Sequence, residues 1–327
     1  MSGMSRSLCL MALRSASARP MTRTFTLGTR GSPLAVAQAR SVAGALEAVH
    51  GWASGTVVIR TIRTSGDKIQ DRPLAEVGGK ALWTKELDRA LIDRETDLSV
   101  HSMKDVESQR PETLVIAAML ERADGRDRLI GVGSIEGLKP GALVATSSPR
   151  RAAQLLALRP DLRIEPIRGN VQTRLDKIAR GEADATMLAA AGLDRLGIEA
   201  GSPVPVETML PAPGQAAIGI ECRSDDEEMR GLLAAIDHQA THAAVRIERA
   251  FTRALGGSCH SPVAALAEVT DDGMRLRAEI LSGDGAERIA EDRIVANEGE
   301  AEALAAAMLE RACPATRNLF VGSDQGA

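Results

Sequence analysis

The chain has 327 residues, of which 44% are hydrophobic, so it is long enough for two or three domains with sizeable cores. A formal net charge of -4 argues against a general polyanion binder such as a nucleic-acid protein, and an aromatic content of 2% argues against stacking of bases on aromatic rings. The four cysteines have no regular spacing, which indicates free thiols in a reducing compartment and argues against a zinc site.

The first 23 residues contain four arginines and several serines, and no acidic residue occurs before Glu47, a composition that suits a transit peptide. Their longest apolar stretch, 8–13, is too short for the core of a secretory signal, and Met21 lies just before the first strand pattern. For residues 1–22 we therefore favour an upstream-extended start, which we expect to be disordered. No apolar run approaches the roughly 20 residues that cross a membrane, so no membrane association is expected.

Residues 24 to 100 alternate between strand and helix patterns. Ser32 is a good N-cap and Pro33 suits the first helical position, so a helix is expected to begin there. The polar, glycine-bearing stretch 64–79 is too long for a tight connection and is a candidate mobile lid. The expected elements are a strand at 24–28, an Ala-rich helix from Pro33, a strand at 57–62, a helix at 82–94 and a strand at 98–100.

The same order recurs beyond Gly125. Ser148 and Pro149 repeat the cap arrangement of Ser32 and Pro33, and a further helix is capped by Asn170. Strands are expected at 142–145 and 162–167, and helices at 149–158 and 171–180. Alternation of this kind implies parallel α/β sheets.

The pattern changes after Asp237 and indicates a separate α+β module. The sequence Ser-Gly-Asp-Gly at 282–285 reads as a hairpin turn between two strands. The expected elements are a helix at 242–255, strands at 262–270, 274–281 and 288–295, and an amphipathic helix at 298–311.

Three of the expected helix starts carry arginine: Arg30, the pair Arg150 and Arg151, and then Arg168 with Arg174. A helix start offers free N–H groups and the positive end of the dipole, and a guanidinium adds a fork that matches a carboxylate or phosphate. Any one of these arginines could equally be a solvated surface residue. Because the dipole disfavours cations there unless an anion compensates, the recurrence favours an anion-binding cleft.

Lys104 and Asp105 follow directly on the strand at 98–100, at the strand end where open α/β sheets bind ligands. Asp105 could act as a general acid or base, or accept hydrogen bonds from a cationic or N–H group of a substrate. The two residues could equally form an ordinary surface pair. His101 is read as a structural histidine.

Cys259 lies in a turn of small residues, with His260 beside it. Adjacent residues on an extended segment point to opposite faces, so a catalytic Cys–His pair is disfavoured. An exposed thiol could instead hold a group covalently.

Seven motifs, in the same order, resemble those of porphobilinogen deaminases, also called hydroxymethylbilane synthases, over about residues 24 to 265. Any one is a modest signal, but the set leaves little room for chance. The motifs are T-R-G-S-P-L-A from Thr29, V-G-G-K-A-L-W-T-K-E-L from Val77, V-H-S-M-K-D from Val100, T-S-S-P-R-R from Thr146, R-G-N-V-Q-T-R from Arg168, L-P-A-P-G-Q-A-A-I-G-I-E-C-R from Leu210, and G-S-C at Cys259.

The resemblance implies two periplasmic-binding-protein-like α/β lobes around a cleft and a smaller C-terminal α+β domain with a three-stranded antiparallel sheet. The implied domains are 23–122 with 216–236, then 123–215, then 237–327. The implied reaction is the head-to-tail condensation of four porphobilinogen molecules with loss of ammonia, which gives linear hydroxymethylbilane for tetrapyrrole, porphyrin and heme biosynthesis. It takes place on a covalent dipyrromethane cofactor, in a cytoplasmic monomer that binds neither nucleic acid nor membrane.

By motif match, Asp105 is the implied catalytic residue, which would assist loss of the aminomethyl nitrogen and stabilise positive charge on the pyrrole nitrogens of the resulting azafulvene. Cys259 would hold the cofactor through a thioether. Each pyrrole carries an acetate and a propionate, and arginine forks suit these acids. The resemblance assigns Lys104, Ser148, Arg150, Arg151, Arg168 and Gly169 to cofactor binding, Arg30, Ser32, Trp83 and Arg174 to substrate binding, and Asp67 and Lys80 to the lid; it implies no metal.

Two departures from the family pattern are Gly256, where an acidic residue is frequent, and Trp83, where phenylalanine is frequent. The first leaves the thiol in place, and the second keeps a flat ring at the cleft. The main alternative is a solute-binding protein, since two lobes around an anion cleft also suit that class, but Cys259 would then have no use. A Cys–His hydrolase would need a base and an oxyanion site near Cys259, and neither is identified.

Overall fold

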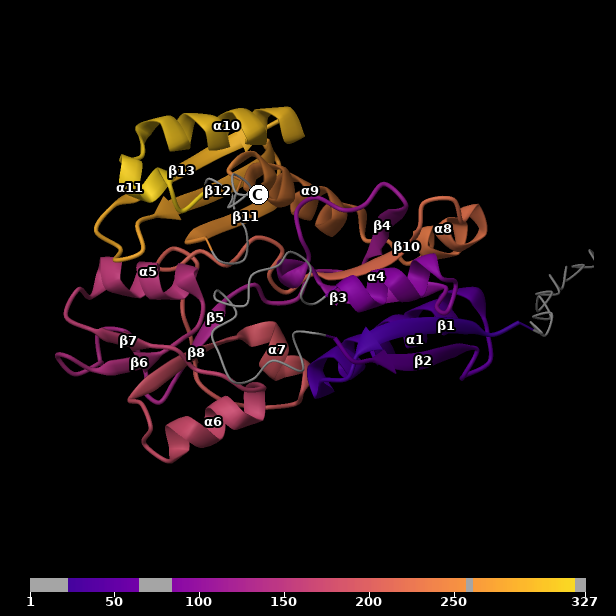
Figure 1. Ribbon diagram of the computed structural model, residues 1–327, viewed down its shortest axis with the longest axis horizontal. Helices are drawn as coiled ribbons and strands as arrows, with labels where there is room; N and C mark the ends of the chain where they lie inside the picture. Colours follow the sequence, from indigo (N-terminus) through magenta and orange to yellow (C-terminus); the bar gives the residue numbers. More distant parts are fainter. Residues whose placement is uncertain (1–22, 65–83, 257–260, 321–327) are drawn as a thin grey trace, which may run out of the picture.

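The computed structural model describes residues 23–64, 84–256 and 261–320 of the chain. It contains two five-stranded sheets with flanking helices, which form two lobes, and a three-stranded sheet beside both of them (Figure 1).

The first lobe is built on the sheet with strand order β2-β1-β3-β10-β4. Helix α1 covers it by packing Val42 and Leu46 with Phe25 and Leu27 in one apolar cluster, because the apolar side chains of α1 recur at helical spacing. The elements are β1 (Phe25–Arg30), α1 (Pro33–His50), β2 (Val57–Ile62), α4 (Lys85–Ile92), β3 (Leu98–Ser102), the 3₁₀ turn η1 (Met103–Asp105), β4 (Leu114–Met119), β10 (Ile218–Arg223) and α8 (Glu227–Ala234).

The second lobe is built on the sheet with strand order β7-β6-β8-β5-β9, around a core that includes Leu129, Val144, Leu155 and Met187. Its elements are β5 (Asp127–Ile130), β6 (Leu143–Ala145), α5 (Pro149–Leu158), β7 (Arg163–Glu165), α6 (Val171–Ala179), β8 (Ala185–Ala189), α7 (Ala190–Arg195) and β9 (Ser202–Pro203).

The expectation of parallel sheets is wrong for one strand in each lobe. Strand β10 runs antiparallel to β3 and β4, and β5 runs antiparallel to β8 and β9. Both are the strands that the chain enters directly after it crosses between the lobes, from β4 to β5 and from β9 to β10. Each crossing leaves one sheet at the carboxyl ends of its parallel strands and enters the other sheet at the carboxyl ends of that sheet's parallel strands. The strand that follows the crossing therefore runs antiparallel to its neighbours.

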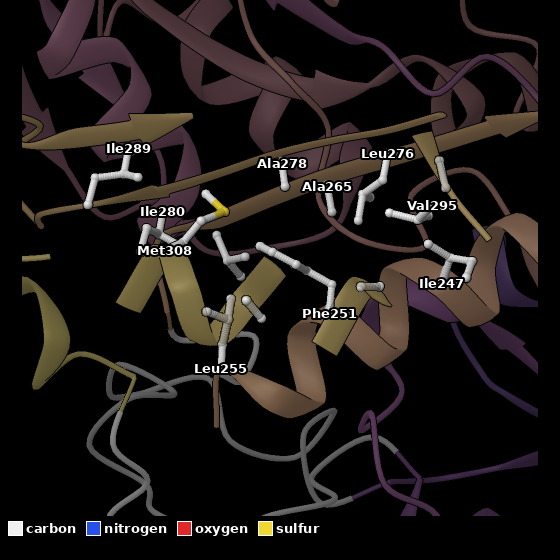
Figure 2. Packing of buried hydrophobic residues seen from close by; sticks show 14 of the residues in the cluster. Ile247, Phe251, Leu255, Ala265, Leu276, Ala278, Ile280, Ile289, Val295 and Met308 are labelled. Atoms are coloured by element: carbon white, nitrogen blue, oxygen red, sulfur yellow. The ribbon is translucent and has the colours of Figure 1, made fainter. Parts of the chain in front are cut away.

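The C-terminal module has the predicted α+β composition. Strand β12 pairs with β11 and β13, all antiparallel, and Leu281 lies opposite Arg288, which confirms the hairpin at 282–285. Helices α9 and α10 cover one face of the sheet, and Phe251 packs there over the small side chains of Ala265 and Ala278 (Figure 2). The elements are α9 (Gln239–Ala254), β11 (Val263–Thr270), β12 (Gly273–Leu281), β13 (Arg288–Val295), α10 (Glu298–Arg311) and α11 (Pro314–Arg317).

This module contacts both lobes. The tip of its hairpin meets α5 at Gly285, whose φ is 72°, and a Cβ there would lie 2.4 Å from the carbonyl oxygen of Ala153. Only glycine therefore fits that contact. On the other side, the carboxylate of Glu248 on α9 accepts a bidentate ion pair from Arg122, which follows β4. Figure 1 shows the module lying along the second lobe at α5 and along the first lobe at α9.

Candidate active site

Three helices begin where the sequence predicts them, with the predicted caps. The side chain of Ser32 accepts a hydrogen bond from the backbone N–H of Ala35, Ser148 accepts from Arg151, and Asn170 accepts from Thr173. Each cap satisfies one backbone N–H of its helix start. The first residue of two of these helices is a proline, Pro33 or Pro149, which has no N–H to satisfy.

Lys104 and Asp105 lie in the turn η1 that ends strand β3. A cavity of about 60 Å³ beside this turn is lined by Asp105 together with Arg30 and Ser32 from the start of α1. Gln38 and Ser102 line the same cavity and hydrogen-bond to each other at 2.9 Å. The structure thus brings the predicted carboxylate and the first predicted anion-binding helix start to one place.

The second lobe contributes its cations to the same region. The pKa of Arg174 is lowered to about 10, first by burial and then by repulsion from Arg151 and Arg168, while Asp105 opposes the shift. The pKa of Lys104 is lowered to about 8, first by burial, with Arg151 adding to the shift and Asp105 opposing it. Asp105 therefore lies within electrostatic reach of cations on both lobes.

Asp127 is a site residue that the sequence does not reveal. Its carboxylate accepts from Arg151 Nη2 at 2.7 Å and Nε at 3.2 Å, from Arg150 Nη2 at 2.8 Å, and from Gln215 Nε2 at 2.9 Å. These two arginines hold the pKa of the buried Asp127 far below its usual range, against the effect of burial. In the sequence Asp127 stands between Arg126 and Arg128 and reads as part of a solvated charge run.

The contacts of Asp127 change the expected picture of the arginine pair. Arg150 also donates through Nη1 to Gln154 and to the carbonyl of Leu210, so its fork binds groups of the protein itself. Arg151 also donates through Nη1 to the carbonyl of Met187, in the middle of β8. Contacts within the protein therefore hold both guanidiniums in place, and Asp127 is the counter-ion of the arginine pair.

Arg195 is a second candidate site residue that the sequence does not reveal. It ends α7, which packs against α1 of the other lobe, and its Nη2 donates to the carbonyl of Ala216 at 2.6 Å. Burial lowers its pKa. An arginine in the last turn of a helix ordinarily complements the dipole, so its position in the sequence carries no signal of a site.

The remaining predicted residues have different outcomes. His101 is buried, with Nε2 3.1 Å from Glu221 Oε2, which accounts for it as a structural histidine. Gly169 has φ 114° just before the cap of α6, and a Cβ there would lie 2.6 Å from the side chain of Thr173. Four predicted site residues lie outside the described residues: Asp67, Lys80, Trp83 and Cys259.

Within residues 23–64, 84–256 and 261–320, no three His, Cys, Asp or Glu side chains lie together as metal ligands would. Across the same ranges, none of the helices is long and apolar enough to cross a membrane.

Fold and site together define a two-lobed protein with Asp105 and a set of cations near the meeting of its lobes, suited to a ligand that bears several acids. Residues 25–231 match the family model described as "Porphobilinogen deaminase, dipyromethane cofactor binding domain", and residues 242–312 match "Porphobilinogen deaminase, C-terminal domain". The chain belongs to the porphobilinogen deaminase family. The second match extends through the module for which the sequence motifs give only a loose resemblance.

Curated relatives agree with this assignment. The chain is 55% identical over 301 residues to the porphobilinogen deaminase of Sphingopyxis alaskensis, covering 90% of this chain and 96% of that protein. It is 49% identical over 272 residues to that of Paracoccus denitrificans, covering 82% and 87%. Among solved structures it aligns with substrate binding domain 2 of Lactococcus lactis GlnP at 12% identity, covering 73% and 93%, with a TM-score of 0.42.

Proposed function

We propose that the chain joins four porphobilinogen molecules head to tail and releases linear hydroxymethylbilane, with Asp105 as its catalytic carboxylate and Cys259 as the attachment point of a dipyrromethane. Each addition breaks the bond between the aminomethyl carbon and its nitrogen, releases ammonia and forms a carbon–carbon bond to the next ring. The observation that carries the proposal is the position of Asp105 within electrostatic reach of Lys104 in its own turn and of Arg174 from the other lobe, in a member of this family.

The donors of the cleft fit a dipyrromethane, which bears an acetate and a propionate on each ring. The pKa of Arg174 is lowered first by burial and then by repulsion from Arg151 and Arg168, so the described part of the cleft holds several cations close together. We assign Lys104, Ser148, Arg151, Arg168 and Gly169 to the acids of the cofactor. Arg150 has a supporting role, because it keeps Arg151 and Asp127 in their positions. When bound, the cofactor supplies the ring on which chain growth begins.

Asp105 has two tasks in this proposal. It accepts hydrogen bonds from the substrate ammonium group and pyrrole N–H, which orients the breaking carbon–nitrogen bond. It then stabilises the positive charge that develops on the ring as ammonia leaves. Arg30, Ser32 and Arg174 hold the substrate acids, and the neighbouring cations keep these acids ionised. We assign Trp83 to the substrate as well, and Asp67 and Lys80 to a lid.

Replacing Arg151 tests the cationic side of the cleft. We expect Arg151→Leu to lower kcat/KM by about 10- to 100-fold, because a charge-assisted hydrogen bond contributes roughly 1.5–3 kcal/mol. Arg150→Leu should impair both holoenzyme formation and activity, because Asp127 and Gln154 each lose a hydrogen-bond donor. The matched control is Arg180→Leu, at the far end of α6, where the arginine pairs with Glu182 on the surface. Wild-type kcat/KM and full cofactor content in Arg151→Leu would refute the assignment.

Lys104 gives the enzyme a pH dependence with a defined direction. Its pKa of about 8 means that its charge is lost as pH rises through 8, so the binding of carboxylates weakens there. We expect an alkaline limb in the pH profile of kcat/KM near this value, and Lys104→Arg should move that limb upward. An unchanged limb in Lys104→Arg would show that another group titrates.

The same shift has a consequence for stability. The folded pKa of Lys104 lies below its unfolded value of 10.5, so the unfolded chain binds more protons between pH 8 and that value. The contribution of Lys104 to the free energy of unfolding therefore rises with pH over this window.

We further propose three domains, each built on one sheet: 23–122 with 216–236, then 123–215, then 237–327. The three sheets fall one to each of these ranges, which supports the division. We place the protein in the cytoplasm as a monomer that binds neither nucleic acid nor membrane. Size-exclusion chromatography with light scattering tests the monomer.

A further inference from the structure

Helix α9 reaches from the C-terminal module to the turn that carries Asp105. The guanidinium of Arg249 donates from Nη1 to the carbonyl of Val106 at 3.1 Å and from Nη2 to the carbonyl of Glu107 at 2.5 Å. These carbonyls belong to the two residues that directly follow Asp105. The helix therefore holds the exit of the catalytic turn through its backbone.

The guanidinium of Arg249 makes these two hydrogen bonds in a position where burial disfavours its charge. Burial lowers its pKa to about 10, and the neighbouring Arg110 adds to the shift. The carboxylates of this region are bound by Arg110 instead, which pairs with Asp88, Glu107 and Glu221. Among the residues that the structure describes, no salt bridge to Arg249 is found, so its hydrogen bonds to the two carbonyls, with attraction from Glu221 and Glu107, compensate its desolvation.

The preceding residue of α9 holds the other side of the same turn. Glu248 accepts a hydrogen bond from the backbone N–H of Gly214 at 2.6 Å. Gly214 has φ 69° and packs against the backbone of Met103, where a Cβ would lie 3.0 Å from the Met103 carbonyl carbon. The side chain of Met103 fills the space above Gly219, where a Cβ would lie 2.1 Å from its sulfur. Two consecutive residues of α9 thus bracket the turn Met103–Asp105.

We infer that Arg249 is a positioning residue for Asp105: it fixes the exit of the turn Met103–Asp105 relative to helix α9. The inference rests on the role proposed for Asp105. It means that the position of the catalytic carboxylate depends on a helix of the C-terminal module. Displacement of a reacting group by about 1 Å costs on the order of 10²-fold in rate, so loss of this clamp acts on kcat.

The test compares Arg249→Met with Arg249→Lys and a matched control. Arg249→Met keeps the apolar stem but loses both donors, and we expect full cofactor mass, a kcat at least about 10-fold lower and a KM within about twofold of wild type. Arg249→Lys can reach one carbonyl and should recover part of kcat. The control is Arg246→Met, one turn earlier on α9, where the arginine pairs with Glu298 inside the C-terminal module. Its kcat should equal that of wild type.

A kcat within twofold of wild type in cofactor-loaded Arg249→Met would overturn the inference. If Asp105→Asn is inactive in the same assay, the proposed function survives that outcome. If Asp105→Asn is also fully active, the proposed role of Asp105 has failed first. Should Arg249→Met not fold, Arg249→Lys decides: a reduced kcat at unchanged KM supports the clamp, and a wild-type kcat overturns it.

Discussion

Asp105→Asn is expected to yield a protein that carries its covalent cofactor and yet turns over porphobilinogen at least about 10²-fold more slowly than wild type. The amide keeps the shape of the carboxylate, so the cavity shared with Arg30 and Ser32 should remain intact. It removes the negative charge that balances the cations of the cleft and stabilises the developing positive charge on the ring. The measurement is initial-rate kinetics on holoenzyme whose cofactor content has been checked by mass.

A matched control separates this effect from a general loss of charge. Asp93→Asn removes a carboxylate that ends α4 on the surface, where it pairs only with Arg89 among the contacts described. We expect its kcat/KM to stay within about twofold of wild type, because surface pairs contribute little. A near-normal rate in Asp105→Asn would remove Asp105 from the mechanism and with it the role of the clamp on α9.

Cys259→Ala is expected to give a chain of unmodified mass without synthase activity, because the thiol is the proposed anchor of the cofactor. The two cysteines within the described residues give no substitute. Cys222 is buried, and burial raises its pKa to about 12, so its thiol stays protonated and unreactive. Cys313 is exposed but caps the short helix α11, where its sulfur accepts from the backbone N–H of Thr316.

Cys313→Ser is the control for this variant, because serine keeps the cap of α11. It should retain both the cofactor and full activity. A Cys259→Ala protein that still carries a covalent dipyrromethane, or that turns over porphobilinogen at the wild-type rate, would place the anchor elsewhere.

Local signals in the sequence predict the elements that begin at a recognisable cap or turn. Ser32, Ser148 and Asn170 identified three helix starts because a capping side chain acts within its own turn. The hairpin at 282–285 and the strand and helix that follow it were placed correctly for the same reason. The sequence patterns place no element at the strands β4, β5, β8, β9 and β10 or at the helices α7 and α8. The parallel direction expected for the sheets is wrong for β5 and β10, because strand direction depends on where the chain crosses between the lobes and not on the residues within the strand.

The sequence predicts which charged residues form the site, but it does not predict the partners that hold them in place. The arginines, Lys104 and Asp105 stand out by their place after strand ends and at helix starts. The partners that fix them are distant in the sequence: Asp127 is 24 residues from Arg151, and Glu107 is 142 residues from Arg249. A buried pairing of this kind leaves no local pattern, so Asp127 and Arg249 read as ordinary surface charges until the fold joins them to their partners.

Membership of the porphobilinogen deaminase family decides between the classes that the sequence left open. Two lobes around an anion-binding region also suit a solute-binding protein, and the sheets alone do not distinguish the two. The family assignment does, since its first domain model is described as binding the dipyromethane cofactor. Under the proposed function Cys259 is the attachment point of that cofactor, a role that neither a solute-binding protein nor a Cys–His hydrolase would give it.

The intact mass of the purified protein, with and without porphobilinogen, tests the central claim most directly. We expect the protein alone to exceed the mass of its chain by two linked pyrroles, and brief exposure to substrate to add species that are heavier by successive single pyrrole units. A protein of unmodified mass that nevertheless converts porphobilinogen into hydroxymethylbilane would contradict the account.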